Sequence, residues 1–173
     1  MLVCLFRGLG DHRDLSGGDR RQREVCIRDS AMTTELAVLG AIVVIASRDH
    51  TKCEEAAKEV NDTLTGGPRV FAGPSTSIRK EEDIQNLISY VIKEFGSLDL
   101  LVNNAGGQFV SPAEDVSNRG FSAVVETNLT GTFLVCREAY TQYMKDHGGS
   151  IVNITLGNRN GMPYMIHSGG TSS

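Results

Sequence analysis

Short apolar runs alternate with amphipathic stretches along residues 31–173. Residues 42–46, 98–102 and 151–154 are almost entirely apolar and only four or five residues long. A strand buried on both faces of a parallel sheet has this length and this pattern. Residues 69–72 form a weaker strand candidate. These runs predict the strands of a buried sheet.

Between the apolar runs the hydrophobic period changes to that of a helix. In the clearest predicted helix, apolar residues recur at i, i+3, i+4, i+7, i+8 and i+11. This helix ends before Gly96, and glycine commonly ends helices. Further helices are predicted before Gly40, from Thr51 to residue 60, and over residues 118–146. The apolar residues of the clearest helix are Ile84, Leu87, Ile88, Val91, Ile92 and Phe95.

The alternation of strands and helices determines the expected fold class. Parallel strands need crossover connections, which are usually helices. We therefore expect an α/β fold, a doubly wound parallel sheet of the Rossmann type. Ligands in such sheets bind beyond the carboxyl ends of the strands, so residues after 46, 102 and 154 are the candidates for chemistry.

Residues 1–30 differ from the rest of the chain. They contain six arginines, five acidic residues and no lysine, and they are poor in apolar residues after Phe6. Such a segment buries too little surface to offset its ordering entropy. We expect 1–30 to be an atypical Arg-rich segment, disordered over residues 7–30, and 31–173 to be a partial Rossmann-type dinucleotide-binding domain.

Composition excludes several classes of function. The net charge of −4 gives no reason to expect a nucleic acid as partner. The apolar runs are too short for a membrane span. Four scattered cysteines show no spacing typical of metal ligands, so no metal site is predicted.

Three motifs point to a family. Residues 103–106 read Asn-Asn-Ala-Gly directly after a predicted strand, residues 126–132 carry Asn128 within a predicted helix, and residues 151–154 form the last apolar run. In this order and spacing they resemble the short-chain dehydrogenase/reductase family, over about residues 31–170.

Shorter segments resemble one branch of that family. Residues 43–48, 106–109, 111–114, 147–154 and 167–169 are similar to peroxisomal trans-2-enoyl-CoA reductases. The 2,4-dienoyl-CoA reductases and 3-oxoacyl-type reductases share parts of this pattern and remain alternatives. The resemblance implies an NADPH-dependent reduction of a trans-2-enoyl-CoA in fatty-acid elongation, with an acyl-CoA substrate and a peroxisomal location.

The resemblance also implies cofactor-binding residues. Ser47 and Arg48 follow the second strand, where the adenosine ribose lies in the family. A guanidinium there suits a 2′-phosphate, and no acidic residue stands at the position that would hold a ribose diol, which favours NADPH. The residues expected to line the adenosine side are Asn103, Asn104, Ala105 and Gly106.

The expected catalytic residues depart from the family pattern. Asn128 matches an asparagine that holds an ordered water in the family's proton relay. Thr155 stands at the usual serine position, and Ser168 stands at the usual tyrosine position. Tyr164, one helical turn earlier, is an alternative acid, and Ser172 replaces the usual lysine.

Both ends of the family pattern are altered. The glycine-rich phosphate-binding turn should precede Met32 but is absent there, and Gly8–Gly10 lacks the third glycine and the helix that should follow. We expect the sheet to lack its usual first strand, unless residues 1–6 substitute for it, and to lack the C-terminal strands. The chain is accordingly expected to be truncated at both ends and inactive or impaired as a reductase.

A second hypothesis is a non-catalytic isoform. Exposed sheet edges favour association, so the chain would form a homo-oligomer, or a hetero-oligomer with its full-length relative. The tail 171–173 is not an SKL-like signal, so we expect the chain as written in the cytosol. Acyl-chain preference and oligomeric state do not follow from the sequence.

Overall fold

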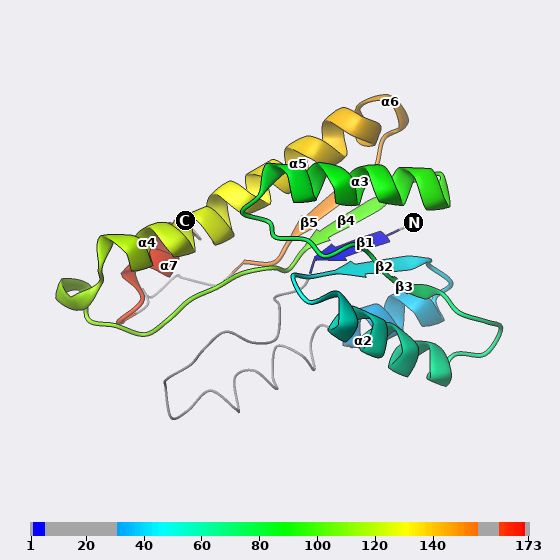
Figure 1. Ribbon diagram of the computed structural model, residues 1–173, viewed down its shortest axis with the longest axis horizontal. Helices are drawn as coiled ribbons and strands as arrows, with labels where there is room; N and C mark the ends of the chain where they lie inside the picture. The colour runs from blue at the N-terminus through cyan, green and yellow to red at the C-terminus, as the bar shows by residue number, and fades with distance from the viewer. Residues whose placement is uncertain (1, 6–30, 156–162, 172–173) are drawn as a thin grey trace.

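Five short parallel strands form one sheet at the centre of the molecule (Figure 1). The computed structural model describes residues 2–5, 31–155 and 163–171. Along the sheet the strands follow the order β3-β2-β1-β4-β5. The doubly wound parallel sheet expected from the sequence is confirmed. The strands are β1 (Leu2–Leu5), β2 (Val43–Ala46), β3 (Val70–Ala72), β4 (Leu100–Asn103) and β5 (Ser150–Asn153).

β1 occupies the central position of the sheet. Leu2 pairs in register with Val43 of β2 on one side and with Leu100 of β4 on the other. This corrects the expectation that the central strand is missing: residues 2–5 substitute for the strand that the family pattern places just before Met32. The physical reason is that this apolar run suits a strand between two others. Residues 7–30, expected to be disordered, lie outside the described residues.

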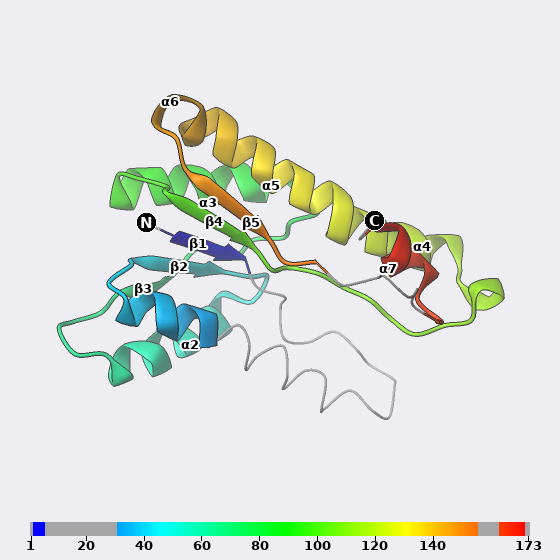
Figure 2. The same cartoon turned by 180° about the vertical axis from the view of Figure 1, so that it is seen from behind.

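Helices cover both faces of the sheet (Figures 1 and 2). The helical residues 31–38 and α2 (His50–Thr63) lie on one face. On the other face lie α3 (Glu81–Phe95) and a long helical run over residues 118–147. The sheet is thus sandwiched between two helical layers, as a doubly wound fold requires.

The strands divide their side chains between two cores. Val43 and Ile45 pack with α2, whereas Val44 and Ala46 pack with α3 and the long run. This alternation follows from the two-residue period of a strand. All four residues of β2 are buried, which explains its continuous apolar sequence.

α3 ends where its sequence predicted, before Gly96. Ile84, Leu87, Ile88 and Val91 are fully buried against the sheet. Gly96 ends the helix at φ 79°, in the left-handed region that residues with a side chain rarely adopt. In α2, by contrast, Ala56 is exposed, so the predicted apolar side of that helix is narrower than expected.

The long helical run is continuous but not uniform. Two π-helical stretches interrupt it, and the first of them carries Asn128. A π stretch inside an α-helix is rare and is often found at functional sites. Its segments are α4 (Asn118–Val125), η2 (Glu126–Gly131), α5 (Thr132–Ala139), η3 (Tyr140–Met144) and α6 (Lys145–His147).

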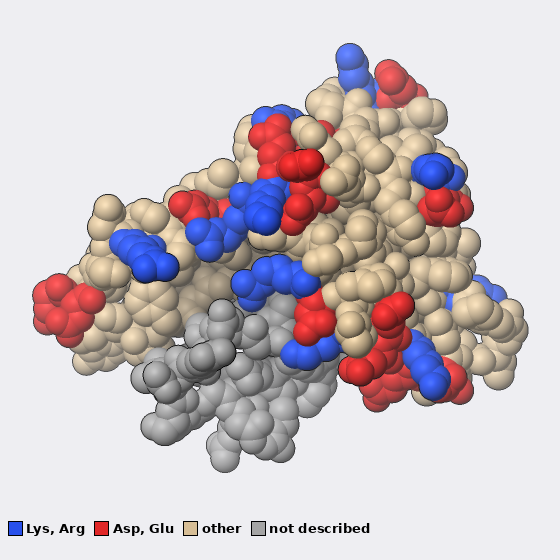
Figure 3. Space-filling view, viewed as in Figure 1, with Lys and Arg blue, Asp and Glu red and all other residues tan. Residues whose placement is uncertain are grey.

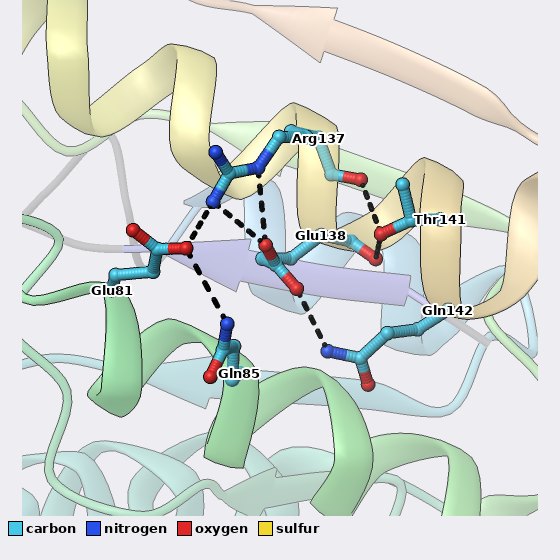
Figure 4. Close-up of polar contacts among 6 residues, drawn as sticks. All are labelled: Glu81, Gln85, Arg137, Glu138, Thr141 and Gln142. Carbon is cyan, nitrogen blue, oxygen red and sulfur yellow. Dashed lines mark hydrogen bonds and ion pairs between the residues drawn. The ribbon is translucent and has the colours of Figure 1, made fainter.

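A polar network holds α3 against the long run (Figure 4). Arg137 contacts Glu81 of α3 and lies 3.0 Å from the buried carboxylate of Glu138, which also accepts a hydrogen bond from Gln142 at 3.2 Å. On the face drawn in Figure 3, basic and acidic side chains are interspersed along these helices. The network fixes the helix that carries Asn128 relative to the sheet.

β5 is an edge strand with little cover. All four of its residues are exposed, including Ile151 and Val152 at 38% and 43%. Two short helical segments complete the described structure: η1 (Ala113–Asp115) and α7 (Ile166–Thr171), which lies beside α4.

Candidate functional site

The carboxyl end of β2 leads into a tight turn that exposes Arg48. The Ser47 hydroxyl is buried, accepts from the amide of Asp49 at 3.2 Å and lies 3.2 Å from Sγ of Cys53. The Arg48 carbonyl accepts from the Ser75 hydroxyl at 2.8 Å. Within the part of the chain that the structure describes, the exposed Arg48 guanidinium forms no ion pair. Arg48 is therefore available for an anionic ligand.

Asp49 is engaged in starting α2. Its carboxylate accepts from the amide of Lys52 at 3.2 Å and lies 3.5 Å from the Lys52 ammonium. An N-cap of this kind satisfies one of the free amides of the first turn. The one acidic residue that follows Arg48 in this turn is thus committed to the helix.

The ends of β4 and β5 are joined by an asparagine pair. Nδ2 of Asn103 donates to Oδ1 of Asn153 at 2.9 Å and lies 3.2 Å from Sγ of Cys136. Burial raises the pKa of the Cys136 thiol, and the hydrogen bond from Asn103 lowers it in part. Oδ1 of Asn103 is buried and has no hydrogen-bond partner among the described residues. Asn104, next in the chain, is also buried.

Asn128 fastens the loop that follows β4. Its Oδ1 accepts from the amide of Gly107 at 2.7 Å, and its Nδ2 donates to the carbonyl of Gly107 at 3.0 Å. A side chain on Gly106 would bring its Cβ to 3.5 Å from Oδ1 of Asn128. One acceptor site and one donor of the Asn128 amide are thus used on the backbone of Gly107, and they hold the loop that follows β4.

The remaining catalytic candidates differ in accessibility. Thr155 follows β5 and is exposed, and Tyr164 is 61% exposed with a left-handed φ of 61°. Ser168 is fully buried, and its hydroxyl has no partner among the described residues. Among the described residues, no hydrogen bond joins these three side chains to one another. Ser172, at the usual lysine position, lies outside the described residues.

His167 and Phe109 form a pair that the sequence did not identify as part of the site. Their rings stack at 4.2 Å between centroids with an interplanar angle of 17°. The Phe109 amide donates to Nε2 of His167 at 3.4 Å. The two residues lie 58 positions apart, so no local period signals the contact; an apolar residue beside a glycine-rich loop was the only available hint.

The described residues contain neither a candidate metal site nor a candidate membrane-spanning helix. Residues 2–5, 31–155 and 163–171 contain no group of three or more His, Cys, Asp or Glu side chains placed to hold a metal ion. Over the same residues, none of the helices combines the length and the hydropathy that crossing a bilayer requires.

Comparison with known proteins supplies a family context. Residues 30–166 match the family model described as short chain dehydrogenase. A peroxisomal 2,4-dienoyl-CoA reductase [(3E)-enoyl-CoA-producing] of Danio rerio is 41% identical over 132 residues, covering 75% of this chain and 43% of the relative. A probable 2,4-dienoyl-CoA reductase [(2E)-enoyl-CoA-producing] of Bacillus subtilis is 36% identical over 126 residues, covering 72% and 48%.

The arrangement of the strands and helices also matches solved structures. A citronellol catabolism dehydrogenase of Pseudomonas aeruginosa superposes with a TM-score of 0.78 at 36% identity, over 99% of this chain and 62% of that one. The chain spans less than half the length of the two reductases named above.

Proposed function

Because the chain belongs to the short-chain dehydrogenase family, we propose that the carboxyl edge of its sheet binds NADPH and that it provides the nucleotide-binding part of an acyl-CoA reductase. The observation that carries the proposal is the set of groups along this edge. The exposed Arg48 guanidinium after β2 forms no ion pair with a described residue, and the buried Oδ1 of Asn103 at the end of β4 has no hydrogen-bond partner among the described residues. In open parallel sheets, nucleotides bind at this edge.

The described residues suit the adenosine side of a dinucleotide. A buried carbonyl oxygen without a partner, such as Oδ1 of Asn103, is costly unless a ligand or water satisfies it. Asn104, Ala105 and Gly106 continue from it, and Gly106 leaves the backbone open to close approach. Residues 6–30, where the family pattern places the turn that holds the pyrophosphate, lie outside the described residues, and their sequence lacks the glycine-rich pattern of that turn.

Arg48 supports NADPH over NADH. A guanidinium makes charge-assisted, bidentate contacts with a phosphate, which the 2′-phosphate of NADPH provides and NADH lacks. Asp49, the nearest acidic residue after Arg48, is used on α2 and Lys52 and does not compete for a ribose diol. Ser47 sets the turn that presents Arg48.

For the substrate we propose an unsaturated acyl-CoA, with a 2,4-dienoyl-CoA favoured over a trans-2-enoyl-CoA. The relatives named above are 2,4-dienoyl-CoA reductases, whereas the sequence resemblance had pointed first to the enoyl branch. Making a 3-enoyl product adds hydrogen at C2 and C5 of the diene. The nicotinamide, when bound, supplies hydride, and a protein group must supply a proton.

Among the catalytic candidates, exposure favours Tyr164 as the acid. Its phenol is accessible, as is the Thr155 hydroxyl at the usual serine position, whereas Ser168 is buried. Asn128 acts on the loop backbone rather than on substrate. We assign Tyr164 the proton transfer, Thr155 the polarisation of the thioester carbonyl, and Asn128 the positioning of the nucleotide loop.

The exposed β5 strand supports a second candidate function, association with a full-length relative without catalysis. Its four residues are all exposed, and the apolar residues Ile151 and Val152 of the strand and Ile154 just after it are exposed at the sheet edge. A strand of another chain can add to such an edge. The Danio rerio relative is named peroxisomal, and we carry that location over as part of this proposal.

A turnover assay tests the proposed function. The purified chain is incubated with NADPH and either 2,4-hexadienoyl-CoA or trans-2-hexenoyl-CoA, and NADPH absorbance is followed. The proposal expects faster oxidation with the dienoyl-CoA, and Tyr164→Phe should lower kcat by roughly 100-fold or more, as loss of an acid does. NADPH binding without turnover on either substrate would rule out catalysis and leave association, tested by co-elution with the full-length relative.

A further inference from the structure

The loop after β4 is fixed at alternate residues. The amides of Gly107, Phe109 and Ser111 donate to Oδ1 of Asn128, Nε2 of His167 and the carbonyl of Tyr164, at 2.7, 3.4 and 2.9 Å. Alternate amides with partners on one side are typical of an extended segment. Two of the three partners belong to residues 163–171, so this segment and the loop hold one another.

His167 makes the longest of these three hydrogen bonds, at 3.4 Å, and adds a ring stack to it. The imidazole is fully buried in α7 and accepts through Nε2, which leaves Nδ1 as the ring nitrogen that can donate a hydrogen bond. Nδ1 has no partner among the described residues. Burying an unpaired donor costs stability, and the stacking on Phe109 and the acceptor contact to its amide are the interactions that offset the cost.

The Phe109 ring also lies close to α4. A Cβ on Gly120 would lie 3.0 Å from Cζ of Phe109 and 3.2 Å from Oγ of Ser117, the residue that caps α4. The lack of a side chain at position 120 therefore leaves room for the ring. The ring contacts Gly120 and stacks on His167, and the amide of Phe109 donates to the same imidazole.

We propose that His167 is a positioning residue for the nucleotide-binding loop: through Phe109 it holds residues 103–111 where Asn103 and its neighbours meet the cofactor. The inference rests on the proposed function, because the loop has to be placed only if it binds a ligand. It also gives His167 a role that links the segment carrying Tyr164 and Ser168 to the cofactor edge. A disturbance at Phe109 then affects nucleotide affinity without any contact between His167 and the nucleotide.

Two measurements on the intact chain test this role. Amide hydrogen exchange, read residue by residue by NMR without nucleotide, reports the hold on the loop directly. The dissociation constant for NADPH reports its consequence. The variants are His167→Leu, which removes ring and acceptor, and His167→Gln, whose amide oxygen can reach the position of Nε2. His147→Leu is the matched control, because His147 also stacks on a ring, Tyr143, at 4.2 Å but at the far end of the long run.

The expected result is faster exchange at Phe109 and Ser111 in His167→Leu, by about tenfold, with partial recovery in His167→Gln. NADPH binding should weaken by about 3- to 10-fold in His167→Leu and stay unchanged in His147→Leu. Unchanged exchange and unchanged affinity in a folded His167→Leu overturn the inference. If the parent chain binds no NADPH, the proposed function fails, and the exchange data alone decide whether His167 positions the loop. If His167→Leu does not fold, His167→Gln replaces it in both measurements.

Discussion

At Asn128, one side-chain amide makes the pair of hydrogen bonds that a neighbouring strand would make. It both donates to and accepts from Gly107, and it does so from a π-helical stretch. The family resemblance singled out Asn128 as a candidate catalytic residue, and asparagine is unfavourable within helices. Its partner in the loop was beyond the reach of sequence reasoning, because Gly107 lies 21 residues away.

Replacing Asn128 should destabilise the fold. Asn128→Asp keeps an acceptor for the amide of Gly107. It replaces the donor to the Gly107 carbonyl with a carboxylate oxygen, which cannot donate. We therefore expect the free energy of unfolding to fall by about 1–3 kcal/mol. Urea unfolding measures the change. Asn86→Asp, at an exposed position of α3, is the control and should alter stability by less than about 0.5 kcal/mol. Equal effects in the two variants would contradict the role given to Asn128.

Cys53 should make stability sensitive to alkaline pH. Burial raises the pKa of its thiol, although the hydrogen bond with Ser47 lowers it in part. The folded chain therefore keeps the thiol proton to higher pH than the unfolded chain, whose thiols titrate near about 8.5. Its contribution to stability is present below that pH and is lost as the pH rises through the raised folded value.

The melting temperature should thus fall between pH 8 and pH 10, and it should fall less in Cys53→Ala. For each protein, the melting temperature at pH 10 is subtracted from that at pH 8, and the two differences are compared. A lower melting temperature of the variant at both pH values therefore does not affect the comparison. Cys136, whose thiol pKa is also raised, is present in both proteins. A parallel fall in the parent and in Cys53→Ala would show that Cys53 does not carry the effect.

Among the elements, the junction between η2 and the segment before α3 is the tightest. A Cβ on Gly131 would lie 2.8 Å from the backbone carbonyl oxygen of Ile78. Backbone atoms cannot move aside as a flexible side chain can, so this close approach needs glycine. The contact sets how near the helix carrying Asn128 comes to the sheet.

Gly131→Ala should therefore cost about 1–3 kcal/mol of stability, as overpacking does. Gly170→Ala in α7 is the control, because nothing lies within 4 Å of a Cβ there. Thermal unfolding of both variants measures the difference. A Gly131→Ala protein as stable as the control would mean that the helix can shift away from Ile78 without loss.

Predictability from sequence differed among the elements for a physical reason. The helix ending at Gly96 was predicted because its apolar period and its closing glycine are local signals. The interruption of the 118–147 run by π-helical stretches has no such signal; it depends on packing against α3 and the loop after β4. The four strands predicted from apolar runs, β2 to β5, begin within two residues of their predicted starts. A buried apolar run locates a strand well but locates its ends less well.

On the scale of the whole molecule, the sheet order depended on a pairing that sequence reasoning left open. Residues 1–6 were considered as a substitute first strand, and β1 pairs with both β2 and β4. Such contacts join residues about 40 and 100 positions apart along the chain, so no local pattern specifies them. The family motifs nevertheless located the carboxyl edge correctly, because parallel strands bring their ends together at one edge.

The central claim is that this edge binds NADPH through Arg48 and the loop after β4. Calorimetric titration of the chain with NADPH and with NADH, repeated with Arg48→Gln, tests it most directly. We expect saturable binding of NADPH, about tenfold weaker binding of NADH, and loss of most of that difference in Arg48→Gln, since the variant removes a charge-assisted phosphate contact. Absence of NADPH binding to a cooperatively folded chain, or a preference for NADPH that persists in Arg48→Gln, would contradict the account.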